Sequence, residues 1–150
     1  MRNFSIAIDI AAPPARVADV MTDVEHWREW TPSVTSIRRF GSGPFAVGDR
    51  MLIRQPRLPP AMWKVVAIDP DRGFESVSGG PGLRVIARHG VVPVAGGSRA
   101  TLSLELKGAL GGLFGRLTKG LTERYLAMEA TGLKARSEDP RFRHSGAQNL

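Results

Sequence analysis

Apolar and polar residues alternate along the first regular stretch of the chain, FSIAIDI at residues 4–10. Phe4, Ile6, Ile8 and Ile10 fall on one side of an extended backbone, and small or polar residues fall on the other. A period of two is typical of a β-strand that buries one face. The stretch therefore predicts a strand, and its interrupted apolar run argues against a secretory signal peptide.

A helical period replaces this alternation in AAPPARVADVMTDV, residues 11–24. Its prolines suit a first helical turn, and Val17, Val20, Met21 and Val24 recur at helical spacing. The next stretch, EHWREWTPSV, carries two of the three tryptophans of the chain. It predicts a second short helical piece that ends before the proline, because a residue that precedes proline disfavours helix.

Strands and turns fill the chain from residue 33 to residue 107. The predicted strands here are SVTSIRRF, GDRMLIRQ, AMWKVVAI, FESVS, LRVIARHGVV and SRATLSLELK, separated by short segments rich in glycine, proline and aspartate. Connections of hairpin length favour antiparallel neighbours. Together with the first strand, these segments predict a seven-stranded antiparallel sheet.

The period changes again after Gly108. Apolar residues recur three and four positions apart at Leu110, Phe114, Leu117, Leu121, Tyr125 and Met128, with charged residues between them. This pattern predicts one long amphipathic helix that ends near Arg136 and lays its apolar stripe on the sheet. The polar sequence that follows predicts a flexible tail at residues 138–150, which leaves residues 1–137 as a single domain.

Alternation also predicts which side chains of the sheet face inward, because charged residues collect on the solvated face. The predicted inward residues are Met51, Ile53, Gln55, Trp63, Val85, Ala87, His89, Ala100, Leu102, Leu104 and Leu106. Arginines such as Arg50, Arg54, Arg84 and Arg88 fall on the outer face. We therefore interpret the formal net charge of +7 as a solvated basic face. Because no aromatic residues interleave with these arginines as a stacking platform, no nucleic-acid partner is expected.

The composition excludes several kinds of chemistry. The chain has no cysteine, which excludes disulfides and thiolate metal sites. Its three histidines lack the spacing of metal ligands. No apolar run approaches the roughly 20 residues that cross a bilayer, and no phosphate-binding loop or Ser-His-Asp arrangement is evident. We expect a cytoplasmic protein without a metal or other cofactor.

The order of these elements (strand, helix, short helix, six strands, long helix) resembles the helix-grip fold of the START-like (SRPBCC) superfamily, above all its polyketide cyclase/dehydrase-like branch. The segments that carry the resemblance lie between Phe4 and Glu138: IAAPPARVADVMTDVEHWREWTPSVTSI, VGDRMLIRQPRLPPAMWKVVAIDPDRGF, RVIARHGVVPVAGGSRATLSLELKG and LFGRLTKGLTERYLAMEATGLKARSE. The resemblance implies an α+β fold in which a curved seven-stranded antiparallel sheet wraps around the long C-terminal helix, with two short helices after the first strand. It also implies a deep apolar cavity between sheet and helix. Members bind lipids, polyketides, hormones or quinones, and only some are enzymes.

The same resemblance places Trp27 and Trp30 in a paired-tryptophan segment beside the cavity mouth, where they would anchor the short helices and one could form a wall. His89 is the one histidine predicted to face inward, and it could hydrogen-bond a ligand carbonyl or act as a general acid or base. No carboxylate is evident to orient it, which favours binding over catalysis. Tyr125 and Gln55 are further polar candidates, although a core tyrosine and an exposed strand end explain them equally well.

The leading hypothesis is a domain that binds a hydrophobic small molecule, such as a lipid or polyketide, in this cavity. The predicted ligand-binding residues are Trp27, Trp30, Met51, Ile53, Gln55, Trp63, Val85, Ala87, His89, Leu102, Leu104, Phe114, Leu117, Leu121 and Tyr125. One alternative is a polyketide aromatase/cyclase-like enzyme. Another is a module that docks on an anionic lipid surface or a partner through its basic face. The sequence names no catalytic residue and leaves open whether the chain forms a homodimer.

Overall fold

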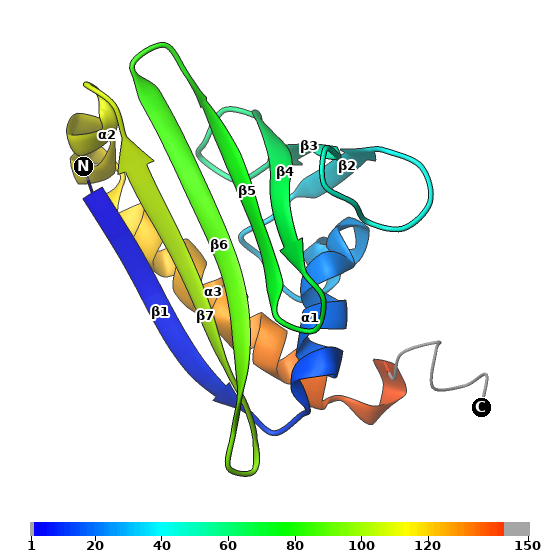
Figure 1. Ribbon diagram of the computed structural model, residues 1–150. Coiled ribbons are helices and arrows are strands. Elements are labelled where there is room, and N and C mark those ends of the chain that lie inside the picture. Colours follow the sequence, from blue (N-terminus) through cyan, green and yellow to red (C-terminus); the bar gives the residue numbers. More distant parts are fainter. Residues whose placement is uncertain (1, 143–150) are drawn as a thin grey trace.

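The computed structural model describes residues 2–142 and contains one antiparallel sheet of seven strands, in the order β1-β7-β6-β5-β4-β3-β2 (Figure 1). The strands are β1 (Arg2–Ile10), β2 (Ser36–Phe40), β3 (Arg50–Arg54), β4 (Ala61–Asp69), β5 (Gly73–Gly80), β6 (Leu83–Val94) and β7 (Gly97–Lys107). Strands that follow one another from β2 to β7 are hydrogen-bonded neighbours, as the short connections predict. The seven-stranded curved sheet of the sequence prediction is confirmed.

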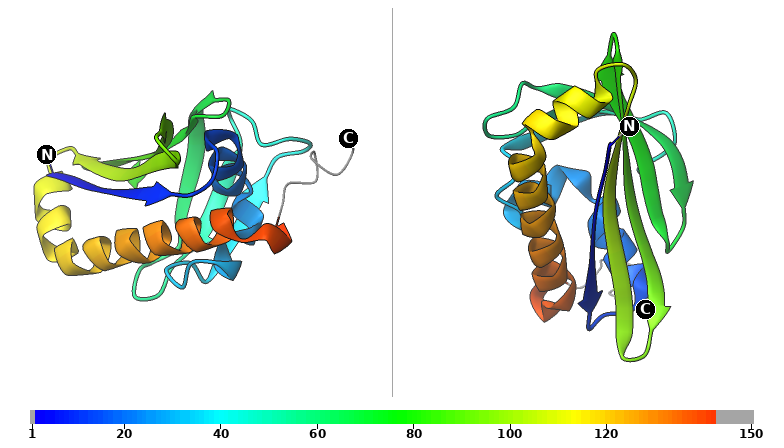
Figure 2. Two further views of the ribbon diagram at one scale, coloured as in Figure 1. Left: turned by 90° about the horizontal axis from the view of Figure 1, so that it is seen from below. Right: turned by 90° about the vertical axis from the view of Figure 1, so that its left-hand side faces the viewer.

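Helices cover one face of this sheet (Figure 2). The helix α1 (Pro14–Thr22) and the 3₁₀ helix η1 (Val24–Glu29) follow β1, while α2 (Gly111–Leu117), α3 (Lys119–Glu138) and the 3₁₀ turn η2 (Pro140–Phe142) follow β7. The long helix α3 packs on β1 and β7, and α1 packs on the inner face of β5, β6 and β7. The predicted fold class, α+β with a C-terminal helix gripped by the sheet, is confirmed.

The predicted assignment of strand faces agrees with the burial of individual side chains. On β3, Met51 and Ile53 are buried, whereas the arginines that flank them are exposed. On β7, the inward Leu102 is buried, as is Ala100 two positions before it on the same face. Alternation is reliable on these two strands because each has one face in the core and one in water.

The C-terminal helix differs from the prediction in that it is broken. Thr118 separates α2 from α3 with a backbone ψ of 6°, and its hydroxyl donates a hydrogen bond to the carbonyl oxygen of Phe114. Figure 2 shows the two helices running in different directions. Glycine and β-branched residues lower helix propensity, and Gly111, Gly115 and Gly120 surround this break.

The buried face of α3 also differs from the predicted apolar stripe. The stripe through Leu121, Tyr125 and Met128 is half-buried, and the most buried positions of the helix include Leu126 and Leu133. The prediction was wrong because it extended the phase of the large apolar residues of α2 across the break. The other buried positions of α3 carry small residues, namely Ala130, Gly132 and Ser137.

Near residue 137, where the sequence predicts the end of the domain, the chain is still part of α3. Helix α3 continues to Glu138, whose carboxylate accepts a hydrogen bond from the backbone N–H of Ala11 at 2.7 Å. Beyond it, Phe142 lies under the Arg136 guanidinium at 3.5 Å from the ring centroid. The rest of the predicted tail, residues 143–150, lies outside the described residues. Between residues 2 and 142, no helix is long and apolar enough to cross a membrane.

Candidate functional site

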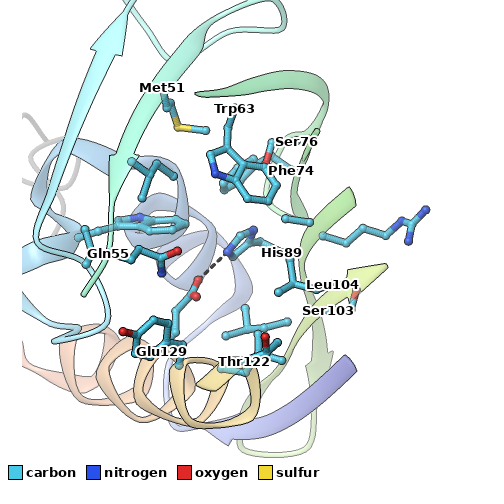
Figure 3. Close-up of a pocket in the computed structure, with 18 of the residues that line it drawn as sticks. Met51, Gln55, Trp63, Phe74, Ser76, His89, Ser103, Leu104, Thr122 and Glu129 are labelled. Atoms are coloured by element: carbon cyan, nitrogen blue, oxygen red, sulfur yellow. Dashed lines mark hydrogen bonds and ion pairs between the residues drawn. The ribbon is translucent and has the colours of Figure 1, made fainter. Parts of the chain in front are cut away.

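A cavity lies between the inner face of the sheet and α3 (Figure 3). Its volume is about 110 Å³. A single water molecule needs roughly 10–15 Å³, so the cavity can hold more than one solvent molecule. Its lining comprises Trp27, Val34, Met51, Ile53, Gln55, Leu58, Trp63, Phe74, Ser76, Ala87, Arg88, His89, Leu102, Ser103, Leu104, Thr122, Tyr125, Leu126 and Glu129. Most of these side chains are apolar, as in typical small-molecule pockets.

The main polar feature of the cavity is a hydrogen bond between His89 of β6 and Glu129 of α3. The imidazole Nε2 lies 2.6 Å from the Glu129 Oε1, and the two side chains are only 10% and 15% exposed. Figure 3 shows that the contact spans the space from sheet to helix. At this distance and burial the contact is a strong hydrogen bond, so it fixes the orientation of the ring.

Two aromatic rings pack against the imidazole. Phe74 of β5 stacks on His89 with centroids 4.7 Å apart and an interplanar angle of 6°. Trp27 of η1 lies 5.0 Å from the imidazole at a tilt of 52°, and its indole N–H donates to the carbonyl oxygen of Met21 at 3.0 Å. The indole is therefore fixed by α1, and the imidazole is held by contacts from three separate elements.

The second imidazole nitrogen, Nδ1 of His89, is buried and has no hydrogen-bond partner among residues 2–142. An ionised carboxylate only accepts hydrogen bonds, so beside ionised Glu129 the proton of a neutral imidazole sits on Nε2. The Nδ1 atom then carries a free lone pair. A buried polar atom without a partner costs about 1–3 kcal/mol, and a hydrogen-bond donor on a ligand would remove that cost.

The β3–β4 connection lies against α3 at the cavity. The Tyr125 hydroxyl donates a hydrogen bond to the carbonyl oxygen of Pro56, and Leu58 of the same connection lines the cavity. The Gln55 amide nitrogen donates to the carbonyl oxygen of Ser33 at 3.1 Å. The hydroxyl of Tyr125 and the amide group of Gln55 thus hold the connection in place, rather than being free to meet a ligand.

Ten of the predicted ligand-binding residues line the cavity: Trp27, Met51, Ile53, Gln55, Trp63, Ala87, His89, Leu102, Leu104 and Tyr125. Five others do not. Trp30 packs on α3, where a Cβ on Gly132 would lie 1.8 Å from the Trp30 carbonyl oxygen. Val85 and Leu121 are half-buried outside the lining, and Phe114 and Leu117 are exposed because the helix breaks at Thr118.

The most important cavity residue that the sequence prediction missed is Glu129. The expectation that no carboxylate orients His89 is wrong, because it followed from the incorrect phase of the helix. Glu129 lies three positions after Leu126 and four before Leu133, which are both buried. Residues at these spacings share a helix face, so an apolar stripe through Leu126 and Leu133 would have predicted an inward Glu129.

Acidic residues offset part of the basic outer face. The Arg88 guanidinium lies 3.4 Å from Glu75 and 3.0 Å from Glu105, and its hydrogen bond lowers the pKa of the Glu105 carboxyl. Arg99 pairs in the same way with Asp9 at 2.8 Å. Within the described part of the chain, no group of three or more histidine and acidic side chains is placed to hold a metal ion.

Solved structures of low sequence identity share this fold. An aromatase/cyclase from Streptomyces sp. R1128 matches with a TM-score of 0.71 and 16% identity over 97% of this chain and 98% of its own. A protein from Thermus thermophilus matches with a TM-score of 0.73 and 19% identity, over 91% and 97% of the two chains. Norcoclaurine synthase from Thalictrum flavum, in complex with dopamine and hydroxybenzaldehyde, matches with a TM-score of 0.69 and 15% identity over 89% and 84%.

The search of curated proteins found no match. A family model, described as polyketide cyclase/dehydrase and lipid transport, matches residues 1–138. This match covers the sheet, the cavity and the whole of α3, and it confirms the family resemblance that the sequence showed. The chain therefore belongs to the polyketide cyclase/dehydrase and lipid transport family of the START-like superfamily.

Proposed function

We propose that this protein binds a small, largely apolar molecule in the cavity and orients it through a hydrogen bond to His89. The observation that carries the proposal is the buried His89–Glu129 pair in a wall that is otherwise mostly apolar. Burial of ligand surface at roughly 25 cal/mol per Å² supplies affinity. The unpartnered Nδ1 of His89 supplies a preference for a ligand that carries one hydroxyl or similar donor.

The test compares 2-naphthol with 2-methylnaphthalene, which have similar apolar surface but differ in the hydroxyl group. Both should bind the wild-type protein and raise its unfolding temperature. We expect 2-naphthol to bind about three- to tenfold more tightly, as a net hydrogen bond of about 0.5–1.5 kcal/mol implies. Fluorescence titration measures both affinities.

Two variants separate the cavity from the hydrogen bond. Ala87→Leu places a larger side chain in the wall and should abolish binding of both compounds, whereas Thr101→Leu on the exposed face of β7 should change neither. The double variant His89→Phe/Glu129→Leu removes both partners of the hydrogen bond and should retain 2-methylnaphthalene while losing the preference for 2-naphthol. Equal binding by wild type and Ala87→Leu would refute the proposed cavity site.

A second candidate function is proton transfer on a bound polyketide, and the hydrogen bond between His89 and Glu129 is the specific observation in its favour. A carboxylate that fixes one imidazole nitrogen leaves the other free to take a proton from a substrate. In this role His89 would accept the proton of a carbon flanked by two carbonyls, and the resulting enolate would attack another carbonyl of the same chain. The oxygen of that carbonyl would then take the proton back from the imidazolium, which restores the neutral imidazole. The solved aromatase/cyclase and norcoclaurine synthase share the fold, which makes the reaction class reasonable to test.

Glu129→Gln distinguishes the two functions. The amide still accepts a hydrogen bond from the imidazole N–H but no longer stabilises a protonated imidazole. If the protein is only a binder, the affinity for 2-naphthol should change by less than about threefold. If it is an enzyme, cyclisation of a poly-β-keto thioester should slow by about 100-fold or more, while binding of that thioester persists.

A further inference from the structure

The short helix α2 buries its small residues and exposes its large apolar ones, which is the reverse of an ordinary surface helix. Its buried positions are Gly111 and Gly115, and its large apolar side chains point to solvent. Leu113 is 57% exposed and Leu117 is 76% exposed. A surface helix normally buries its apolar stripe against the core, so the exposure of leucine here calls for a partner outside the domain.

Close backbone contacts fix this orientation. A Cβ on Gly111 would lie 2.8 Å from the carbonyl oxygen of Leu106, and a Cβ on Gly115 would lie 2.9 Å from the Arg2 side chain. The N–H of Leu110 also donates to the carbonyl oxygen of Gly82 in the β5–β6 turn at 2.8 Å. The glycine face must therefore stay against β1 and β7, and the leucine face must stay outside.

We name the exposed side chains of Leu110, Leu113, Phe114 and Leu117 the α2 patch. Helix α2 lies at one end of the molecule, beside the start of β1 and away from the C-terminal end of α3 (Figure 2). These residues are between 36% and 76% exposed. Contiguous apolar patches on a surface mark contacts with proteins or membranes.

Basic side chains lie on α2 and on the segments next to it. Arg116 is in the helix and Lys119 begins α3, while Arg84 and Lys107 pair near the start of β6 and the end of β7, two strands that contact α2. The exposed cations are Arg84, Lys107, Arg116 and Lys119, and the acids near them are Glu105 and Glu123. Lys107 lies 3.3 Å from Glu105 and Lys119 lies 3.2 Å from Glu123, and the two lysine side chains are 47% and 54% exposed. Surface pairs contribute little, so an anionic surface can compete for these lysines, and cations remain in excess at this end.

We propose that the α2 patch inserts into the surface of an anionic lipid bilayer, with the basic side chains contacting lipid headgroups. Apolar residues flanked by lysine and arginine are the features that bind such interfaces. Helix α2 leads directly into α3, whose Thr122 and Tyr125 line the cavity. The docked protein would therefore hold the cavity wall next to the lipid surface. The proposal does not depend on which molecule the cavity takes.

The experiment is co-sedimentation of the full chain with mixed phosphatidylcholine/phosphatidylglycerol vesicles at low and high salt. We expect wild-type protein to bind these vesicles, to bind pure phosphatidylcholine more weakly and to lose affinity as salt rises. Leu113→Ser/Leu117→Ser should weaken binding by about tenfold or more, because two leucines no longer enter the apolar layer. Arg116→Gln/Lys119→Gln should weaken it by about 25-fold, at roughly fivefold for each charge.

The matched control is Val47→Ser/Val92→Ser, since these valines are 60% and 49% exposed at positions outside the α2 patch. This variant should bind as the wild type does, and both serine pairs should unfold at a similar temperature. Absence of wild-type binding at low salt would overturn the proposal. So would unchanged binding by Leu113→Ser/Leu117→Ser, or a wild-type dimer in sedimentation equilibrium that this variant dissociates, because a second copy would then cover the patch.

Discussion

Two residue pairs on the same two strands show how this fold makes both a solid core and a cavity. Val91 of β6 pairs with Ala100 of β7, and four positions along the ladder Ala87 pairs with Leu104. All four side chains face inward. Val91 and Ala100 are 2% and 0% exposed within the core, whereas Ala87 and Leu104 line the cavity.

The difference arises from what covers each pair. Helix α1 packs on β5, β6 and β7 and brings the fully buried Val17 and Met21 into the core. Over Ala87 and Leu104 the cover comes from α3, whose side chains Thr122, Tyr125, Leu126 and Glu129 line the cavity without filling it. The same strands thus support close packing at one end and a cavity further along.

The largest expected difference in the free energy of unfolding is between truncating a leucine in the solid core and truncating one in the cavity wall. Leu133→Ala in the solid core should lower the free energy of unfolding by about 2–5 kcal/mol, because it leaves a closed void. Leu104→Ala, which only widens an existing cavity, should cost about 1 kcal/mol and weaken 2-naphthol binding. Urea unfolding followed by circular dichroism measures both, and equal losses in the two variants would contradict the comparison.

Enlarging one alanine in the solid core and one in the cavity wall should give a smaller difference in stability. Ala100→Leu forces extra methyl groups into a packed site and should cost about 1–3 kcal/mol. Ala87→Leu has free volume to enter and should change the free energy of unfolding by less than about 1 kcal/mol. The two substitutions add the same groups to inward positions on adjacent strands, so thermal and urea unfolding compare them directly. A destabilised Ala87→Leu protein would indicate that the cavity is already full.

Removing the Tyr125 hydroxyl should affect ligand exchange more than stability. Tyr125→Phe loses the hydrogen bond to the carbonyl oxygen of Pro56, and because the site is partly solvated the cost should stay below about 1 kcal/mol. The β3–β4 connection should then separate from α3 more often, so that 2-naphthol associates and dissociates faster. Stopped-flow fluorescence measures both rates, and unchanged rates would show that this contact does not gate the cavity.

The smallest expected effect is a pH dependence at η1, away from the cavity. The His26 Nδ1 lies 2.7 Å from Asp23, and this hydrogen bond raises the pKa of the imidazole. The folded state therefore holds the proton more tightly than the unfolded state, so the stabilisation is fully present below about pH 6.5 and is lost as pH rises through the raised pKa. The stability difference between wild type and His26→Gln should appear at pH 5.5 and vanish at pH 8. A larger difference at pH 8 would contradict this sign.

The sequence was sufficient to predict the sheet because its strands mostly have one solvated face and one buried face. Alternation therefore placed Met51, Trp63, Ala87 and His89 inside without any knowledge of their neighbours. It was insufficient for the C-terminal helix, because apolar residues do not all face the core. On α2 the leucines point outward.

On α3 the buried face includes small residues that a search for large apolar side chains passes over. This error concealed Glu129, the residue that turns an inward histidine into a candidate site. His89 and Glu129 are 40 residues apart in the sequence. Their pairing therefore could be recognised only from the packing of α3 on the sheet.

Native mass spectrometry of the protein purified from its own host tests most directly whether the cavity is a ligand site. The prediction is a wild-type protein that carries a stoichiometric apolar compound, recovered by organic extraction, together with an Ala87→Leu protein that carries none. If both proteins are free of bound compound, and neither 2-naphthol nor 2-methylnaphthalene stabilises the wild type, the space beside His89 is a packing defect and the proposed function is wrong.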